Sequence, residues 1–158
     1  MKLLPASLLD ELAAKAAALP RLRTNYNIHE AAADPVQRYF VVALRDSYFR
    51  PHRHPTKVET ALVLRGRFDL VTFDDTGAIV ARYGMGEGGS SFGYETPRAT
   101  WHTLVVQSGS TAFFEVKEGP YDPATVVEFA AWAPAEGDAA ASAYLEWLRT
   151  APVGAKRP

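Results

Sequence analysis

Cysteine is absent from the 158-residue sequence, which excludes disulfide bonds and thiolate metal sites. An excess of charge of one sign is also lacking, because 17 basic and 18 acidic residues leave a formal net charge of −1. The charge therefore points to neither a nucleic acid nor a membrane surface as partner. Asp10 and Glu11 interrupt the N-terminal apolar residues, so we find neither a signal peptide nor a membrane span. These absences predict a soluble, cytoplasmic protein.

From residue 38 onward the sequence consists of short runs rich in Val, Phe, Tyr and Thr, separated by Gly, Pro or Asp pairs. Closely spaced runs of this kind are typical of a β-sandwich or small barrel rather than of βαβ units. We expect strands near residues 38–45, 48–54, 58–65, 67–74, 78–83, 91–95, 100–107 and 110–117. The predicted fold class is therefore mainly β.

Two amphipathic helices are expected to flank these strands. Ser7 is a suitable N-cap for a first helix over residues 8–19, which Pro20 ends. Asp138 can cap a second helix over residues 139–149. Because the length fits one domain, we predict a single domain over residues 1–158, with a helical N-terminal arm (7–37), a barrel (38–120) and a C-terminal turn and helix (121–150).

Three of the four histidines have the spacing of metal ligands. His52 and His54 are alternate residues of a predicted strand, so both side chains point to one face. Glu59 is five residues beyond His54, and a turn at Pro55 allows it to face the same way. His102 lies inside another predicted strand. We therefore predict that His52, His54, Glu59 and His102 hold one divalent cation, and this ligand set suits zinc, iron, nickel or manganese.

A metal held in this way keeps positions free for a ligand. Four protein ligands on an ion that accepts five or six leave open coordination positions. Three neutral imidazoles and one carboxylate also leave about one net positive charge, which favours an anionic oxygen ligand or a bound water of lowered pKa. This pattern is typical of a reactive or ligand-binding centre rather than a closed structural one.

The same residues match the sequence motifs of the cupins. The first motif, His-x-His followed by Glu and Gly, is matched by His52, His54, Glu59 and Gly66. The second motif, Pro-x-Gly-x-x-His, resembles Pro97 to His102, with Ala99 where Gly is usual and Val106 where Asn often follows. The resemblance implies a double-stranded β-helix, which is a small jelly-roll barrel, with the metal inside it. It also implies a homodimer, since cupins commonly dimerise.

Further segments resemble the WbuC family of cupin-fold metalloproteins over about residues 20–148. These segments are 25–30, 34–38, 50–55, 101–103 and 113–123. That family is associated by gene neighbourhood with O-antigen polysaccharide clusters. The resemblance therefore implies a small-molecule partner that is a sugar or a sugar nucleotide, and a role in polysaccharide biosynthesis.

Glu115, Lys117 and His29 are the candidate catalytic residues. Glu115 and Lys117 share one strand face, which is either a solvent-facing alternation or an acid/base pair inside the barrel. In the barrel, a metal near Lys117 would lower the pKa of its ammonium group, and a carboxylate would offset that effect. His29 lies outside both motifs, where it either caps a backbone group or acts as a base.

Arg50, Arg98 and Asn27 are the candidate substrate-binding residues. Arg50 and Arg98 flank predicted metal ligands and can bind an anionic substrate group in a two-pronged fashion. Asn27 belongs to a polar segment that can close over the mouth of the barrel.

These residues suggest Lewis-acid polarisation of a hydroxyl or carbonyl, with proton transfer by a side chain. Isomerisation or epimerisation fits this best. The alternatives are an iron-dependent dioxygenase, a non-catalytic metal-dependent sensor, and a metal-free epimerase with His102 or His52 as base.

Overall fold

The computed structural model describes residues 1–157, which form two helices and ten strands. In chain order these are α1 (Ser7–Ala17), β1 (Arg23–Asn27), β2 (Val36–Leu44), β3 (His52–Arg53), β4 (Glu59–Arg65), β5 (Arg67–Phe73), β6 (Ile79–Gly86), β7 (Gly93–Thr96), β8 (Trp101–Val106), β9 (Ser110–Glu118), β10 (Glu128–Phe129) and α2 (Ala141–Thr150). Each of the predicted strands is present, although the one expected over 48–54 is reduced to β3. The additional strands are β1 and β10.

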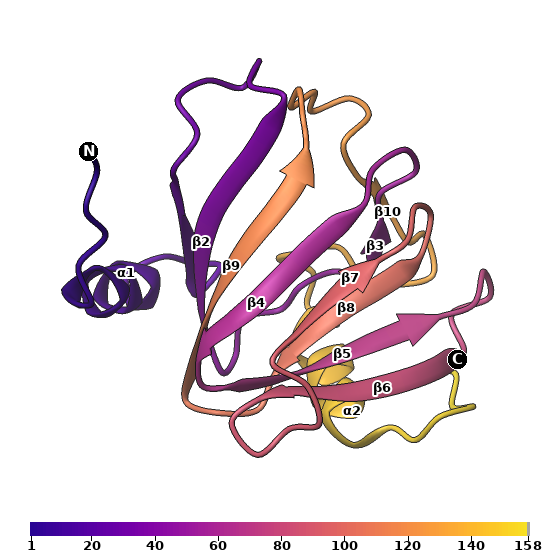
Figure 1. Ribbon diagram of the computed structural model, residues 1–158. Helices are drawn as coiled ribbons and strands as arrows, with labels where there is room; N and C mark the ends of the chain where they lie inside the picture. Colours follow the sequence, from indigo (N-terminus) through magenta and orange to yellow (C-terminus); the bar gives the residue numbers. More distant parts are fainter. Residues whose placement is uncertain (158) are drawn as a thin grey trace.

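The strands form two five-stranded antiparallel sheets (Figure 1). The first has the order β1-β2-β9-β4-β7 and the second the order β10-β3-β8-β5-β6. Apart from β1 with β2 and β5 with β6, neighbours in each sheet are not consecutive in sequence, as in the pairing of β3 with β8. Between β2 and β10 the chain therefore passes repeatedly from one sheet to the other. This is the predicted mainly β jelly roll.

The space between the sheets changes from apolar to charged along its length. Apolar side chains from both sheets fill one part: Val41, Ala61, Phe68, Leu70, Met85, Leu104 and Phe113. On β9, the side chains of Phe113, Glu115 and Lys117 follow one another on the inward face, and all three pair in register with β4. The charged end of the barrel is therefore a continuation of its core.

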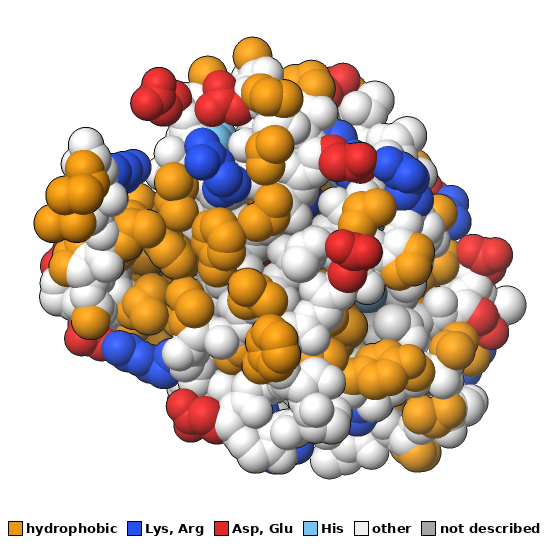
Figure 2. Space-filling view, viewed as in Figure 1, with side chains coloured by type: hydrophobic (Ala, Val, Ile, Leu, Met, Phe, Trp, Pro, Cys, Tyr) orange, Lys and Arg blue, Asp and Glu red, His pale blue; other side chains and the backbone are white. Residues whose placement is uncertain are grey.

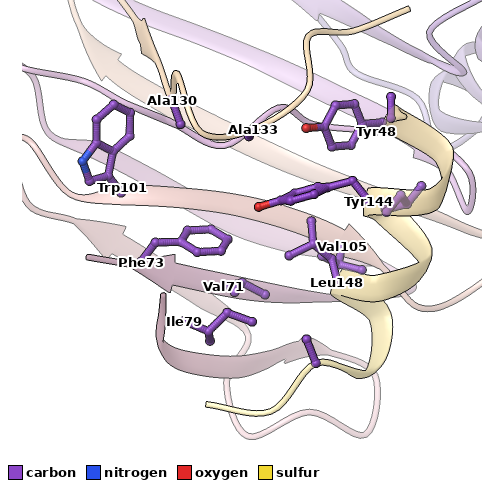
Figure 3. Close-up of a cluster of buried hydrophobic side chains, with 13 residues drawn as sticks. Tyr48, Val71, Phe73, Ile79, Trp101, Val105, Ala130, Ala133, Tyr144 and Leu148 are labelled. Carbon is purple, nitrogen blue, oxygen red and sulfur yellow. The ribbon is translucent and has the colours of Figure 1, made fainter. Parts of the chain in front are cut away.

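Each helix covers the outside of a different sheet. Helix α1 packs on the first sheet, where Leu12 meets Phe40 and Val42. Helix α2 packs on the second sheet, where Tyr144 and Leu148 belong to a cluster of buried side chains (Figure 3). Because one face of β8 points into the barrel and the other towards α2, all of its residues are buried.

The helix boundaries differ from the prediction. Ser7 is the first residue of α1 rather than its cap, and α1 ends at Ala17, so the arm over 7–37 is helical only in its first part. Asp138 does not cap α2, which begins at Ala141. Instead, the Asp138 carboxylate accepts a hydrogen bond from the Ala135 N–H at 2.8 Å. Ser, Thr, Asn and Asp both cap helices and stabilise turns, so their presence in the sequence does not distinguish the two roles.

Two positions in the motifs have a left-handed backbone. Gly66 has φ +74°, and a Cβ atom there would lie 2.2 Å from the Ser110 carbonyl oxygen, so the turn between β4 and β5 requires glycine. Ala99 has φ +61°, a conformation that costs a residue with a Cβ about 1–2 kcal/mol. The Ala99 N–H donates to the His54 carbonyl at 2.8 Å, and this bond ties the second motif to the first.

Hydrophobic side chains gather on the outer face of the first sheet beside α1 (Figure 2). Leu62 and Leu64 of β4 are 40% and 49% exposed, and Phe92 is 76% exposed. In residues 1–157, neither helix is both long and apolar enough to cross a membrane.

Candidate metal centre

Strands β3 and β8 bring three histidines together in the second sheet. His52 pairs in register with His102, and their ring centroids lie 4.5 Å apart. His54 lies just beyond β3, with its ring 5.2 Å from that of His52 and 5.7 Å from that of His102. One ring nitrogen from each histidine lies within 4.8 Å of the others. The structure therefore assembles the three histidines into a cluster that can hold a metal ion.

The tautomer of each ring suits a metal ligand. Each Nδ1 lies within hydrogen-bond distance of a backbone carbonyl: His52 of Arg50 (2.9 Å), His54 of Val126 (2.6 Å) and His102 of Thr100 (2.8 Å). A neutral ring that donates from Nδ1 carries its lone pair on Nε2, where it is free to bind a metal. Metal-bound histidines usually donate their other ring N–H to a carbonyl or carboxylate in this way. Nε2 of His102 is buried and has no hydrogen-bond partner within residues 1–157. The donor set therefore fits a divalent cation.

Glu59 lies against two of the three histidines. Its Oε2 is 3.0 Å from Nε2 of His54, and its Oε1 is 3.5 Å from Nε2 of His102. The same carboxylate accepts hydrogen bonds from Lys117 Nζ (2.7 Å) and from the Tyr94 hydroxyl (3.0 Å). Burial alone would raise the pKa of Glu59, but the charge of Lys117 and the adjoining imidazoles of His102 and His54 hold it well below its usual range. An ionised carboxylate thus lies beside the imidazoles.

Glu115 and Lys117 lie inside the barrel rather than on its outer surface. Lys117 Nζ is 2.7 Å from both Glu115 Oε1 and Glu59 Oε2. Burial alone would lower the pKa of Lys117, but these two carboxylates raise it well above its usual range. Burial and the nearby charge of Glu59 raise the pKa of Glu115. Glu115 also accepts a hydrogen bond from the Tyr39 hydroxyl.

The histidine rings differ in their electrostatics. Burial, together with the neighbouring His102, lowers the pKa of His52 well below its usual range. Burial acts in the same direction on His102, but attraction to the Glu59 carboxylate and the contact of Nδ1 with the Thr100 carbonyl outweigh it and raise the pKa of His102. His52 is therefore neutral at physiological pH, as a ligand must be.

Two adjoining cavities open beside these residues. The first, of about 290 Å³, is lined by Arg23, Arg50, His52, His54, Phe129 and Glu136 among others. The second, of about 390 Å³, is lined by Asn27, His29, Gln37, Lys57 and Glu118 among others. Both cavities share the wall residues Asn25, Tyr39, Lys117, Tyr121 and Val126. The two cavities therefore form one space that reaches the histidine cluster.

The remaining predicted residues lie in different places. His29 lines the second cavity and accepts a hydrogen bond at Nδ1 from the Arg38 N–H (3.0 Å), so its ring contacts the backbone. Asn27 lines the same cavity, and Arg50 lines the first. Arg98 lines neither of them. Its guanidinium is exposed and forms an ion pair with Glu118 at 2.8 Å.

Sequence reasoning did not identify Tyr39 or the backbone carbonyl of Val126 as parts of the site. Tyr39 is far in sequence from Glu115, and only the pairing of β2 with β9 brings the two residues opposite each other. Val126 precedes β10, the short strand that pairs with β3. Tyr39 could have been found from the sequence, because alternation along the strand places its side chain on the same face as that of Val41. A backbone carbonyl, in contrast, has no sequence signature.

The wall of the first cavity contains an ion-pair cluster that makes stability depend on pH. Arg21 binds Glu136 at 2.6 Å, and Arg23 also binds it. Burial alone would raise the pKa of Glu136, but hydrogen bonds and attraction to the two arginines hold it below its usual value. The ionised group therefore stabilises the fold above the unfolded pKa of about 4.3. This contribution is lost as pH falls through the lower folded pKa.

We expect Glu136→Gln to remove this dependence. The free energy of unfolding of the wild type should exceed that of Glu136→Gln by a constant amount above about pH 6, and the difference should shrink below about pH 4.3. Urea unfolding at a series of pH values, from about pH 6 to well below about pH 4.3, measures this difference. Glu146→Gln is the control, because the Glu146 side chain is 64% exposed. A difference that grows as pH falls would contradict the prediction.

Comparison with known proteins agrees with this fold. A sequence profile of the family described as domain of unknown function (DUF6016) matches residues 4–85, while no curated protein matches the sequence. Similar solved structures include protein SO0799 from Shewanella oneidensis (8% identity, TM-score 0.55, covering 68% of this chain and 73% of that chain). Another is oxalate oxidase in complex with the substrate analogue glycolate (14%, 0.53, 71% and 57%). A third is the DMSP lyase DddQ from Ruegeria pomeroyi DSS-3 (16%, 0.54, 72% and 54%).

These similarities concern the fold. At such low identities they show that the chain has the cupin fold, as the sequence motifs predicted. The chain spans little more than half of oxalate oxidase and of the DMSP lyase.

Proposed function

The chain belongs to the family described as domain of unknown function DUF6016, and since that description assigns no activity, we propose a function from the site itself. The protein is a metal-dependent cupin that holds one divalent cation with His52, His54, His102 and Glu59. It binds a small oxygen-bearing ligand beside the cation. The cation belongs to the zinc, iron, nickel and manganese group, which this ligand set suits.

One observation supports the metal more than any other. All three imidazoles direct Nδ1 to a backbone carbonyl, and His102 leaves Nε2 buried without a partner among the described residues. A buried polar atom without a hydrogen bond is costly. A cation held by the three histidines would remove that cost.

The residues around the cavities supply proton transfer. A bound divalent cation supplies Lewis-acid polarisation of a ligand hydroxyl or carbonyl oxygen. Lys117 holds a proton on Nζ at the cavity wall, where it adjoins both Glu59 and Glu115. Glu115, with its raised pKa, and the Tyr39 hydroxyl form a hydrogen-bonded pair behind it. This chain of groups can deliver and take up a proton beside the ligand.

We propose isomerase or epimerase chemistry on a sugar derivative. The sugar and the link to O-antigen polysaccharide biosynthesis rest on the WbuC resemblance and stay predictions. The amide side chains of Asn25 and Asn27 in the cavity walls support a hydroxyl-rich ligand. A non-catalytic sensor uses the same cation and cavity without proton transfer, and a dioxygenase requires iron.

The proposal is tested by solvent-isotope exchange. Metal-loaded protein is incubated in D₂O with a panel of aldoses, ketoses and their phosphates, and deuterium uptake at the carbon next to the carbonyl is followed by NMR. We expect exchange in the wild type and in His29→Gln, and its loss in Glu115→Gln. Binding without exchange would favour the sensor, and oxygen uptake with an iron-loaded protein would favour the dioxygenase. Either result contradicts the isomerase.

We also propose that the protein forms the homodimer predicted from the cupin resemblance. The exposed apolar side chains of Leu62 and Leu64 on the outer face of β4 support it, because monomers rarely expose large apolar patches.

A further inference from the structure

Arg50 differs from the other basic residues in the wall of the first cavity. The others already have carboxylate partners: Arg21 and Arg23 with Glu136, and Lys117 with Glu59 and Glu115. Within residues 1–157, Arg50 has none. A half-buried guanidinium without a counter-charge favours an anion from outside the chain.

The guanidinium of Arg50 is also held in one position. Nη2 donates to the Ala130 carbonyl at 2.8 Å, and the group lies over the Phe129 ring at 5.4 Å from its centroid. Nε is buried and has no hydrogen-bond partner within the described residues. The Arg50 carbonyl accepts the hydrogen bond from His52, so the side chain begins next to the histidine cluster. A planar guanidinium that is fixed in this way and has no carboxylate partner within residues 1–157 is suited to a carboxylate.

The charge balance of the site leads to the same ligand. Lys117 and Glu115 offset each other, and Glu59 offsets one of the two charges of the proposed cation. One charge of the cation, that of Arg50 and one charge of the two arginines that share Glu136 then remain, so an uncharged ligand would leave them uncompensated in a partly buried space.

The second cavity indicates what the rest of the ligand is. It continues from the first beyond Tyr39 and Lys117, and the amide groups of Asn25 and Asn27 lie in its wall. Amides offer both donors and acceptors, which match hydroxyl groups.

We propose that the ligand is a hydroxylated carboxylic acid. Its carboxylate binds Arg50 beside His52, and its hydroxyl-bearing body extends into the second cavity. This inference rests on the proposed function and narrows its ligand to an acid.

The test compares acids with neutral alcohols of the same size. Isothermal titration of metal-loaded protein uses gluconate against sorbitol and glycerate against glycerol. We expect at least one acid to bind at least about tenfold more tightly than its alcohol. Arg50→Gln should remove this preference. Arg50→Lys, which keeps the charge but not the two parallel N–H donors of the guanidinium, should weaken it. Arg65→Gln, whose side chain pairs with Asp10 outside both cavities, should bind like the wild type.

Metal content and melting temperature are measured for each variant. Arg50→Gln should keep both, so that loss of acid binding reports on Arg50 alone. Equal binding of acid and alcohol, no binding of either acid, or an unchanged preference in Arg50→Gln would overturn the inference. A wild type without metal that still prefers the acid through Arg50 would overturn the proposed metal function but not this one.

Discussion

Replacing His102 by alanine is expected to lower the affinity of the protein for a divalent transition metal by at least about 100-fold. Loss of a residue that only hydrogen-bonds to a metal ligand already lowers metal affinity by about 10–100-fold, and His102 is itself a proposed ligand. Its ring is 1% exposed, with Nε2 buried near the other two imidazoles. Competition with a chromophoric chelator measures the affinity.

The fourth histidine provides the matched control for this substitution. His29 lies outside the cluster, with its ring on the Arg38 backbone, so His29→Ala should bind metal like the wild type. Circular dichroism shows whether each variant is folded. Equal affinity in folded His102→Ala and wild type would contradict the ligand assignment.

Replacing Lys117 by methionine is expected to destabilise the metal-free protein by about 3–5 kcal/mol, the usual cost of removing one partner of a buried ion pair. Lys117 is the group that separates the carboxylates of Glu59 and Glu115. Without it, two buried carboxylates face each other, and one must take up a proton. Urea unfolding in the presence of a chelator measures the change.

Lys57→Met is the control, because the Lys57 ammonium donates to the Pro120 carbonyl and forms no ion pair within residues 1–157. Its change should stay within about 0.5 kcal/mol. Since a bound cation also compensates Glu59, metal should raise the melting temperature of Lys117→Met more than that of the wild type. A Lys117→Met protein as stable as Lys57→Met would show that the buried charge network is not needed for stability.

The histidine cluster could be predicted because its signal is local. Alternation places His52 and His54 on one face whatever the rest of the fold, and the turn at Pro55 brings Glu59 into the next strand. These inferences depend on the period of a strand, which a single sequence carries. The pairing of His52 with His102 is shown only by the structure, since the order of the two motifs does not determine which strands pair.

The surroundings of the cluster could not be predicted in the same way. The bond from Tyr39 to Glu115 depends on the register of β2 and β9, and register follows from packing that a single sequence does not display. Strands β1 and β10 are short and mixed in polarity, and they are strands because a neighbour pairs with them. Ser7 and Asp138 had cap signals that also suit turns.

Ala99 illustrates how a departure from a motif can be tolerated. The residue keeps the left-handed conformation that glycine would adopt without cost. The hydrogen bond from its N–H to His54 and the adjoining strand β8 hold the loop in place. The position of His102 is thus retained although the motif is altered.

The most direct test of the central claim is elemental analysis of the purified wild-type protein beside a variant with His52, His54 and His102 all replaced by alanine. We expect about one equivalent of a divalent transition metal per wild-type chain and almost none in the folded triple variant. A wild type without metal after purification and reloading, or equal metal in both proteins, would contradict it.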